Sequence, residues 1–157
     1  MRILGIDPGT SLIGYGIVDV SGKSYRAIAF GDFKTGVNIR NADRVKDVYD
    51  FFNKLVKKFA PDKIALESLF FFKNAKTVIK VSEVRGVLLY VAAKNGLAVA
   101  EFTPLQVKQA VSGYGRAEKA QVQSMVKLIL GLDTIPKPDD AADALAIAIC
   151  CANTLVY

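Results

Sequence analysis

The stretch from residue 2 to residue 20, RILGIDPGTSLIGYGIVDV, decides how the chain begins to fold. Residues 2–7 are a short apolar run that ends in Asp7 and is followed by the turn signal Pro-Gly. A second apolar run, 13–20, comes next, and residues 24–34 give a third, weaker strand pattern. Because only short turns separate these runs, they predict an antiparallel meander.

Helical and strand patterns alternate in the rest of the chain. Apolar residues recur at helical spacing over 41–60, whereas 63–67 (KIALE) is typical of a short strand covered on both faces. The further elements expected are a helix over 75–95, a strand over 97–102, a helix beginning at Thr103-Pro104, and helices over 118–130 and 139–152. Since the last two strands each follow a helix, right-handed crossovers predict that they run parallel to an earlier strand. The expected fold is α/β in one domain, 1–157, with a mixed five-stranded sheet and helices on both faces.

The composition is that of a globular protein and limits its expected location and partners. With 157 residues, 52% hydrophobic and 23% charged, the chain has enough apolar side chains for a real core. It has no apolar run of the roughly 20 residues that cross a bilayer, and no signal-peptide pattern at its start, so we expect a cytoplasmic protein. Its 21 basic and 15 acidic residues give a net charge of +6, which is compatible with nucleic acid as a partner.

The chemistry open to this chain is limited, because it has no histidine and only two cysteines, Cys150 and Cys151. This excludes structural zinc sites, catalytic triads with a histidine base and a disulfide framework. The adjacent cysteines lie in an apolar segment and are most simply interpreted as small buried side chains. Any reaction must therefore use carboxylates, lysines, hydroxyls or a bound metal.

Four carboxylates stand out by their positions: Asp7, Glu67, Asp140 and Asp143. Asp7 and Glu67 each end an apolar strand, where ligands of α/β proteins collect, although the first could be a turn former and the second could reach solvent. Asp140 and Asp143 share one face of the last helix, and Asp139 is best explained as its N-cap. Acids gathered without a histidine repel one another unless a hard cation binds them, which favours Mg²⁺ or Mn²⁺.

Four segments of the sequence resemble the RuvC-type Holliday junction resolvases, which have the ribonuclease H-like fold. They are LGIDPGTSLIGYGIV, IALESLFF, VKQAVSGYGRAEKAQV and PDDAADALAIAI, and they occur in the family's order and at its separations. The resemblance implies a structure-specific endonuclease that acts as a homodimer in recombination and repair. It would nick two symmetric strands of a four-way DNA junction and leave 5′-phosphate and 3′-hydroxyl ends, with the RuvA-RuvB branch-migration complex as a further partner.

The resemblance also assigns roles to single residues. The family's metal-binding acids fall on Asp7, Glu67, Asp140 and Asp143, for two Mg²⁺ ions per site or Mn²⁺ in their place. Asp139 is an alternative to Asp140, although the spacing to Asp143 favours Asp140. The residues expected to contact DNA are Phe70 and secondarily Phe71, which would stack on bases at the crossover, and Lys73, Lys76, Lys80, Lys108, Arg116 and Lys119, which would line a phosphate track.

Other interpretations stay open at this point. DPGTS also resembles the phosphate loop of actin-like and sugar-kinase ATPases, but those enzymes enclose the nucleotide between two such domains. A YqgF-type RNA-processing nuclease would share the fold, although the FFF segment and the VKQ and AEK motifs favour a junction resolvase. An inactive DNA-binding module is the third possibility, and the complete set of four acids argues against it. Any one of the phenylalanines can belong to the core, and any one of the lysines can simply be solvated.

Overall fold

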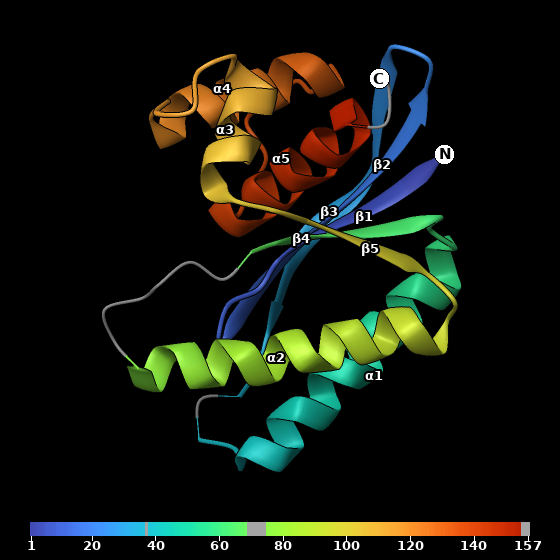
Figure 1. Cartoon of the computed structure of the whole chain (residues 1–157), viewed down its shortest axis with the longest axis vertical. Coiled ribbons are helices and arrows are strands. Elements are labelled where there is room, and N and C mark those ends of the chain that lie inside the picture. The colour runs from blue at the N-terminus through green and yellow to red at the C-terminus, as the bar shows by residue number, and fades with distance from the viewer. Residues whose placement is uncertain (37, 69–74, 155–157) are drawn as a thin grey trace.

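The computed structural model describes residues 1–36, 38–68 and 75–154, apart from the side chains of residues 75–77. Ten elements follow one another along the chain, and every end predicted from the sequence lies within two residues of the observed one (Figure 1). They are β1 (Arg2–Asp7), β2 (Leu12–Ser21), β3 (Ser24–Lys34), α1 (Asn41–Phe59), β4 (Lys63–Glu67), α2 (Ala75–Lys94), β5 (Ala98–Phe102), α3 (Pro104–Ser112), α4 (Lys119–Leu130) and α5 (Asp139–Thr154).

The strands form one five-stranded sheet in the order β3-β2-β1-β4-β5. The first three strands are an antiparallel meander, and β4 and β5 run parallel to β1, which confirms the mixed sheet predicted from the sequence. In the pairing of β1 with β4, Ile6 lies opposite Leu66. The next residues along the two strands, Asp7 and Glu67, therefore end side by side at one edge of the sheet.

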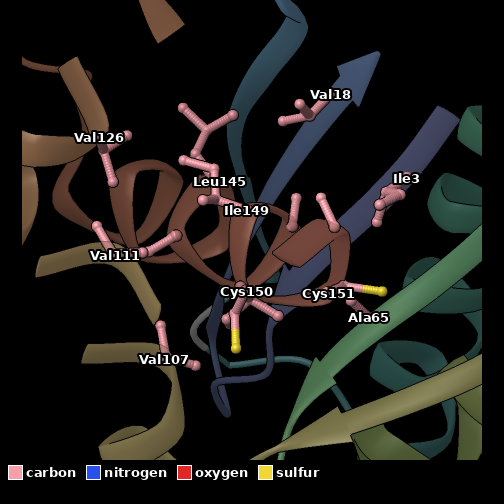
Figure 2. Packing of buried hydrophobic residues seen from close by; sticks show 14 of the residues in the cluster. Ile3, Val18, Ala65, Val107, Val111, Val126, Leu145, Ile149, Cys150 and Cys151 are labelled. Carbon is pink, nitrogen blue, oxygen red and sulfur yellow. The ribbon is translucent and has the colours of Figure 1, made fainter. Parts of the chain in front are cut away.

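Helices cover both faces of the sheet, as expected (Figure 1). On one face α1 and α2 pack on a cluster that includes Leu4, Ile17 and Phe52. On the other face α3, α4 and α5 pack on a second cluster, in which Ile3, Val18 and Ala65 of the sheet meet α5 (Figure 2). Residues 144–152 of α5 are all buried, including the two free cysteines, because this helix is apolar on every side.

Glycines on β1 and β2 let α5 lie directly on the sheet. A Cβ at Gly5 would meet the carbonyl oxygen of Ala144, and a Cβ at Gly14 would meet that of Asp140. Gly14 is also the residue opposite Asp7 in the pairing of β1 with β2. The absence of a side chain at Gly14 therefore places the first turn of α5 beside the end of β1.

We expect Gly14→Ala to destabilise the protein by about 1–3 kcal/mol, because the new methyl group must push the start of α5 off the sheet. The free energy of unfolding, measured in urea, checks this. Any activity that uses Asp140 and Asp143 should fall as well, since both residues move with the helix. A variant with unchanged stability would contradict the close seating of α5.

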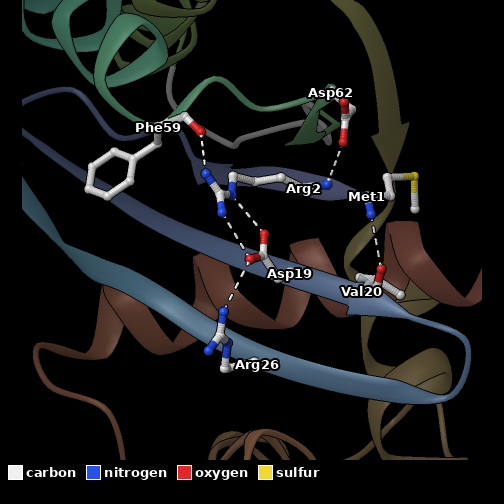
Figure 3. A network of polar contacts seen from close by, with 7 residues as sticks. All are labelled: Met1, Arg2, Asp19, Val20, Arg26, Phe59 and Asp62. Carbon is white, nitrogen blue, oxygen red and sulfur yellow. Dashed lines mark hydrogen bonds and ion pairs between the residues drawn. The ribbon is translucent and has the colours of Figure 1, made fainter.

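Polar contacts fix the opposite end of β1 (Figure 3). The guanidinium of Arg2 donates to the Asp19 carboxylate at 2.7 Å and to the Phe59 carbonyl at 2.7 Å, and the Arg2 backbone N–H donates to Asp62 at 2.6 Å. These bonds join β1 to β2 and to the connection between α1 and β4, which helps to set the register in which Asp7 and Glu67 meet. No helix in the described part of the chain is long and apolar enough to cross a membrane.

Candidate active site

Three structural elements bring acidic side chains together at one edge of the sheet. Asp7 ends β1, Glu67 ends β4, and Asp140 and Asp143 lie in the first turns of α5. A cavity of about 230 Å³ opens here, and Asp7, Glu67 and Asp143 line it. Two of the predicted cationic residues also line it, Lys108 of α3 and Lys119 of α4, and the apolar wall consists of Pro104, Val107, Val122, Ala146 and Ile147.

Asp7 is the most perturbed acid of this group. Burial, together with repulsion from Glu67, Asp143 and Asp140, raises its pKa from 3.8 to about 7, and only Lys119 acts in the opposite direction. A buried carboxylate whose negative charge is offset by only one nearby lysine favours the binding of a cation. Asp140 does not line the cavity, but its charge is felt by Asp7, whereas no effect of Asp139 on Asp7 is resolved.

Glu67 shares this environment. Burial raises the pKa of Glu67, and the charge of Asp143 adds to the increase, while Lys108 lowers it. Lys108 therefore lies close enough to Glu67 for its ammonium to matter electrostatically. Together Asp7 and Glu67 place two half-buried acids, both with raised pKa values, on the same side of the cavity.

Lys119 is the counter-ion of Asp143. Its Nζ donates to Oδ2 of Asp143 at 2.9 Å and lies 3.8 Å from Oδ2 of Asp139. Asp139 is also held by Lys137, whose Nζ lies 2.9 Å from its Oδ1, and this bond lowers the pKa of Asp139. Asp139 is thus paired with two lysines, and the charge of Asp140 but not that of Asp139 acts on Asp7, which favours Asp140 as the second acid of α5 at the site.

The donor set consists of carboxylate oxygens, which is the chemistry that Mg²⁺ and Mn²⁺ prefer. Within the described residues, however, no group of three or more Asp, Glu, Cys or His side chains is arranged so that it could hold a metal ion. The side chain of Asp143 is engaged by Lys119. The donors therefore fit a hard cation in chemistry, and a cation would have to compete with the ammonium of Lys119 for Asp143.

The remaining predicted DNA contacts are not gathered around the cavity. Arg116, in the loop before α4, and Lys80, on α2, are exposed and do not line it. Phe70, Phe71 and Lys73 lie outside the described residues, as does the side chain of Lys76. Their expected roles stay predictions.

Sequence reasoning missed two features that build the site. The first is the pair Gly5 and Gly14, whose signal is the recurrence of glycine on the same face of adjacent strands. The second is Arg85 of α2, whose Nη1 donates to the backbone carbonyl of Glu67 at 3.3 Å. A lone arginine among the apolar residues of VSEVRGVLLYVAA is the pattern that could have indicated it.

The comparison with known families decides among the interpretations left open by the sequence. The model of the family described as "Crossover junction endodeoxyribonuclease RuvC" matches residues 3–151, nearly the whole chain. The chain belongs to the RuvC family of crossover junction endodeoxyribonucleases. RuvC membership confirms the family predicted from the four sequence motifs, the ribonuclease H-like fold and the activity of a Holliday junction resolvase.

Individual RuvC proteins agree with this assignment. The Fusobacterium nucleatum RuvC is 50% identical over 155 residues, which cover 99% of this chain and 82% of that protein. The Heliobacterium modesticaldum RuvC is 49% identical over 157 residues, which cover 100% and 97% of the two chains. A solved structure of T. thermophilus RuvC in complex with a Holliday junction substrate has a TM-score of 0.92 at 33% identity, covering 99% of this chain and 95% of that one.

Proposed function

We propose that this chain, as one nuclease domain, resolves Holliday junctions by a metal-dependent reaction that nicks two symmetric strands and leaves 5′-phosphate and 3′-hydroxyl ends. The observation that carries this proposal is the cavity in which Asp7, Glu67 and Asp143 meet Lys108 and Lys119. The similarity to a RuvC solved with its junction substrate supports four-way DNA as the ligand. Because the proposed substrate is DNA and the relatives are bacterial, the proposal places the reaction in the cytoplasm.

Each side chain has a role that its position suggests. Asp7, Glu67, Asp140 and Asp143 would hold magnesium, which supplies an activated water and stabilises the leaving oxygen of the phosphodiester. Lys108 and Lys119 are the cations nearest to these acids, so they balance the charge of the phosphate that enters the cavity. Asp7 must lose its proton to act as a ligand, and its pKa of about 7 makes the site sensitive to pH in the neutral range.

A comparison of substrates tests this function. Four-way junction, linear duplex and RNA–DNA hybrid of matched sequence are incubated with the protein and magnesium. We expect paired nicks in the junction and little cleavage of the other two substrates. Preferred cleavage of the hybrid would contradict the proposal and favour an RNA-processing nuclease.

We further propose that the protein acts as a homodimer, and that α1 and α2 form the interface. Ile79 and Tyr90 of α2 are 60% and 58% exposed, and with Glu83 and Gly86 they follow one another along one face of the helix. This face borders a groove of about 700 Å³ between α1 and α2, which carries both basic and acidic side chains, among them Lys46 and Glu83. A surface with both signs can pair with its own copy, and a two-fold dimer presents two equivalent sites to a junction of two-fold symmetry.

The dimer is tested with a charge placed in this face. We expect Tyr90→Glu to shift the protein from dimer to monomer in light scattering, because the proposed interface would then bury an unpaired carboxylate from each protomer. Leu128→Glu is the matched control, since Leu128 is 73% exposed on α4, away from the groove, and should leave the dimer intact. A Tyr90→Glu protein that remains dimeric would show that the interface lies elsewhere.

A further inference from the structure

Arg85 is a mostly buried cation in the middle of α2, with a side chain that is 13% exposed. Its guanidinium makes two contacts at the same time. Nη2 forms an ion pair with Oε1 of Glu101 on β5, and Nη1 donates to the backbone carbonyl of Glu67 at 3.3 Å. One planar side chain therefore ties a helix, the edge strand and the end of β4 together.

The two faces of the sheet separate Arg85 from the cavity. Glu101 lies opposite Leu66 in the pairing of β4 with β5, and Leu66 belongs to the core that α1 and α2 share with the sheet. Glu67 is the next residue, so its side chain points to the other face, where it lines the cavity. Arg85 thus contacts the backbone of Glu67 from the face of the sheet covered by α1 and α2, whereas the Glu67 carboxylate lies on the opposite face, at the cavity.

Arg85 bonds to β4 at the position where this strand is no longer paired with β1. The pairing of β1 with β4 ends at Ile6 and Leu66, so Glu67 has β5 on one side only. On that side the backbone N–H of Ser68 donates to the Phe102 carbonyl at 2.8 Å. The hydrogen bond from Arg85 adds a second fixed point at the same peptide unit, which restrains the backbone at Glu67.

We propose that Arg85 is a positioning residue that, with Glu101, orients the Glu67 carboxylate toward the cavity. This inference rests on the proposed function, in which Glu67 acts in metal binding and nicking. A lysine at position 85 keeps the charge but has a single ammonium group, which cannot reproduce the planar fork that reaches Glu101 and the Glu67 carbonyl together.

The test is Arg85→Lys, studied as the full-length protein with a four-way junction. We expect single-turnover nicking at saturating protein to fall about 10-fold, while the Kd for the junction, measured in calcium, stays within about threefold. The magnesium concentration that gives half-maximal nicking should rise, and the increase in melting temperature caused by magnesium alone should shrink. The last measurement reports on the carboxylates without any cleavage.

Two further variants make the outcome decisive. Arg26→Lys is the control, because Arg26 pairs with Asp19 at the far end of the sheet and should behave as the parent does. Glu101→Gln leaves the donor to the Glu67 carbonyl in place but removes its charged anchor, so we expect a smaller change of the same kind; it carries the test if Arg85→Lys fails to fold.

The results separate this inference from the proposed function. Parent-like nicking and magnesium response in Arg85→Lys would overturn the positioning role, and so would a lower melting temperature with an unchanged magnesium midpoint. Glu67→Gln is measured in parallel. If Glu67→Gln is inactive and Arg85→Lys is normal, only the positioning role fails, whereas cleavage by Glu67→Gln would remove Glu67 from the proposed mechanism itself.

Discussion

Replacing Glu67 by glutamine is expected to abolish nicking of four-way junctions and to leave binding of the junction nearly unchanged. Affinity for DNA comes mainly from basic side chains on phosphates, and this substitution removes none of them. The amide keeps the size of the side chain but cannot supply the charge that a cation needs at the end of β4. Losing a ligand of a catalytic metal removes the water activation that it supports, so we expect the rate to drop by at least about a thousandfold.

Gel-shift and cleavage assays on one labelled junction measure both quantities in the same buffer. Asp47→Asn is the matched control, because Asp47 is an exposed acid of α1 that does not line the groove between α1 and α2, and it lies on the face of the sheet opposite to the cavity. It should bind and nick as the parent protein does. Substantial residual cleavage by Glu67→Gln would mean that Glu67 is no metal ligand and that burial and the charge of Asp143 raise its pKa without any role in metal binding.

The fold could be predicted from the sequence because its helices and strands have strong local sequence patterns. The strand expected over 13–20 is observed as Leu12–Ser21, and the helix expected over 139–152 as Asp139–Thr154. Turn residues and capping residues mark most ends, as at Thr103, whose side chain and that of Gln106 form a capping box. Right-handed crossovers then leave few ways to arrange the strands.

The site was accessible only in part, because its construction depends on contacts between distant segments. The positions of Asp7 and Glu67 at strand ends follow from the local pattern, and their adjacency follows from the parallel pairing. The pairing of Lys119 with Asp143 does not follow, since nothing local relates the start of α4 to the first turns of α5. The same is true of Arg85, whose two partners lie on different strands.

The structure also distinguishes acids that look equivalent in the sequence. If four clustered carboxylates all worked equally against folding, neutralising any one of them would stabilise the chain. Asp143, however, has an ion-pair partner in Lys119, and the substitution Asp143→Asn would weaken that pair. Asp7 has no such partner within hydrogen-bonding distance among the described residues, and burial and repulsion act on it together. Asp7 is therefore the acid whose neutralisation should stabilise the fold.

We expect Asp7→Asn to raise the melting temperature in chelator at pH 8 and to remove catalysis. The pKa of Asp7 is about 7 in the folded protein against 3.8 ordinarily, which corresponds to about 4 kcal/mol of destabilisation when the group is ionised. The buried amide still needs polar partners, so a gain of about 2 kcal/mol, or about 4–8 °C, is the expected size.

The dependence on pH identifies the cause of this gain. Between pH 3.8 and about 7 the folded protein keeps the Asp7 proton that the unfolded chain has lost, so the stability of the parent falls as pH rises through this window and levels off above it. The difference between Asp7→Asn and the parent should therefore be below zero at pH 4, where the parent carries no charge at Asp7, rise by about 4 kcal/mol up to about pH 7 and then stay constant. Magnesium should stabilise the parent at pH 8, because it binds only the folded site, and should stabilise Asp7→Asn much less.

Melting curves of both proteins between pH 4 and pH 8, in chelator and in excess magnesium, measure the stability difference and the response to magnesium. An Asp7→Asn variant that melts lower than the parent at pH 8 in chelator, and that responds to magnesium as the parent does, would show that Asp7 is a structural hydrogen-bond acceptor and not a ligand.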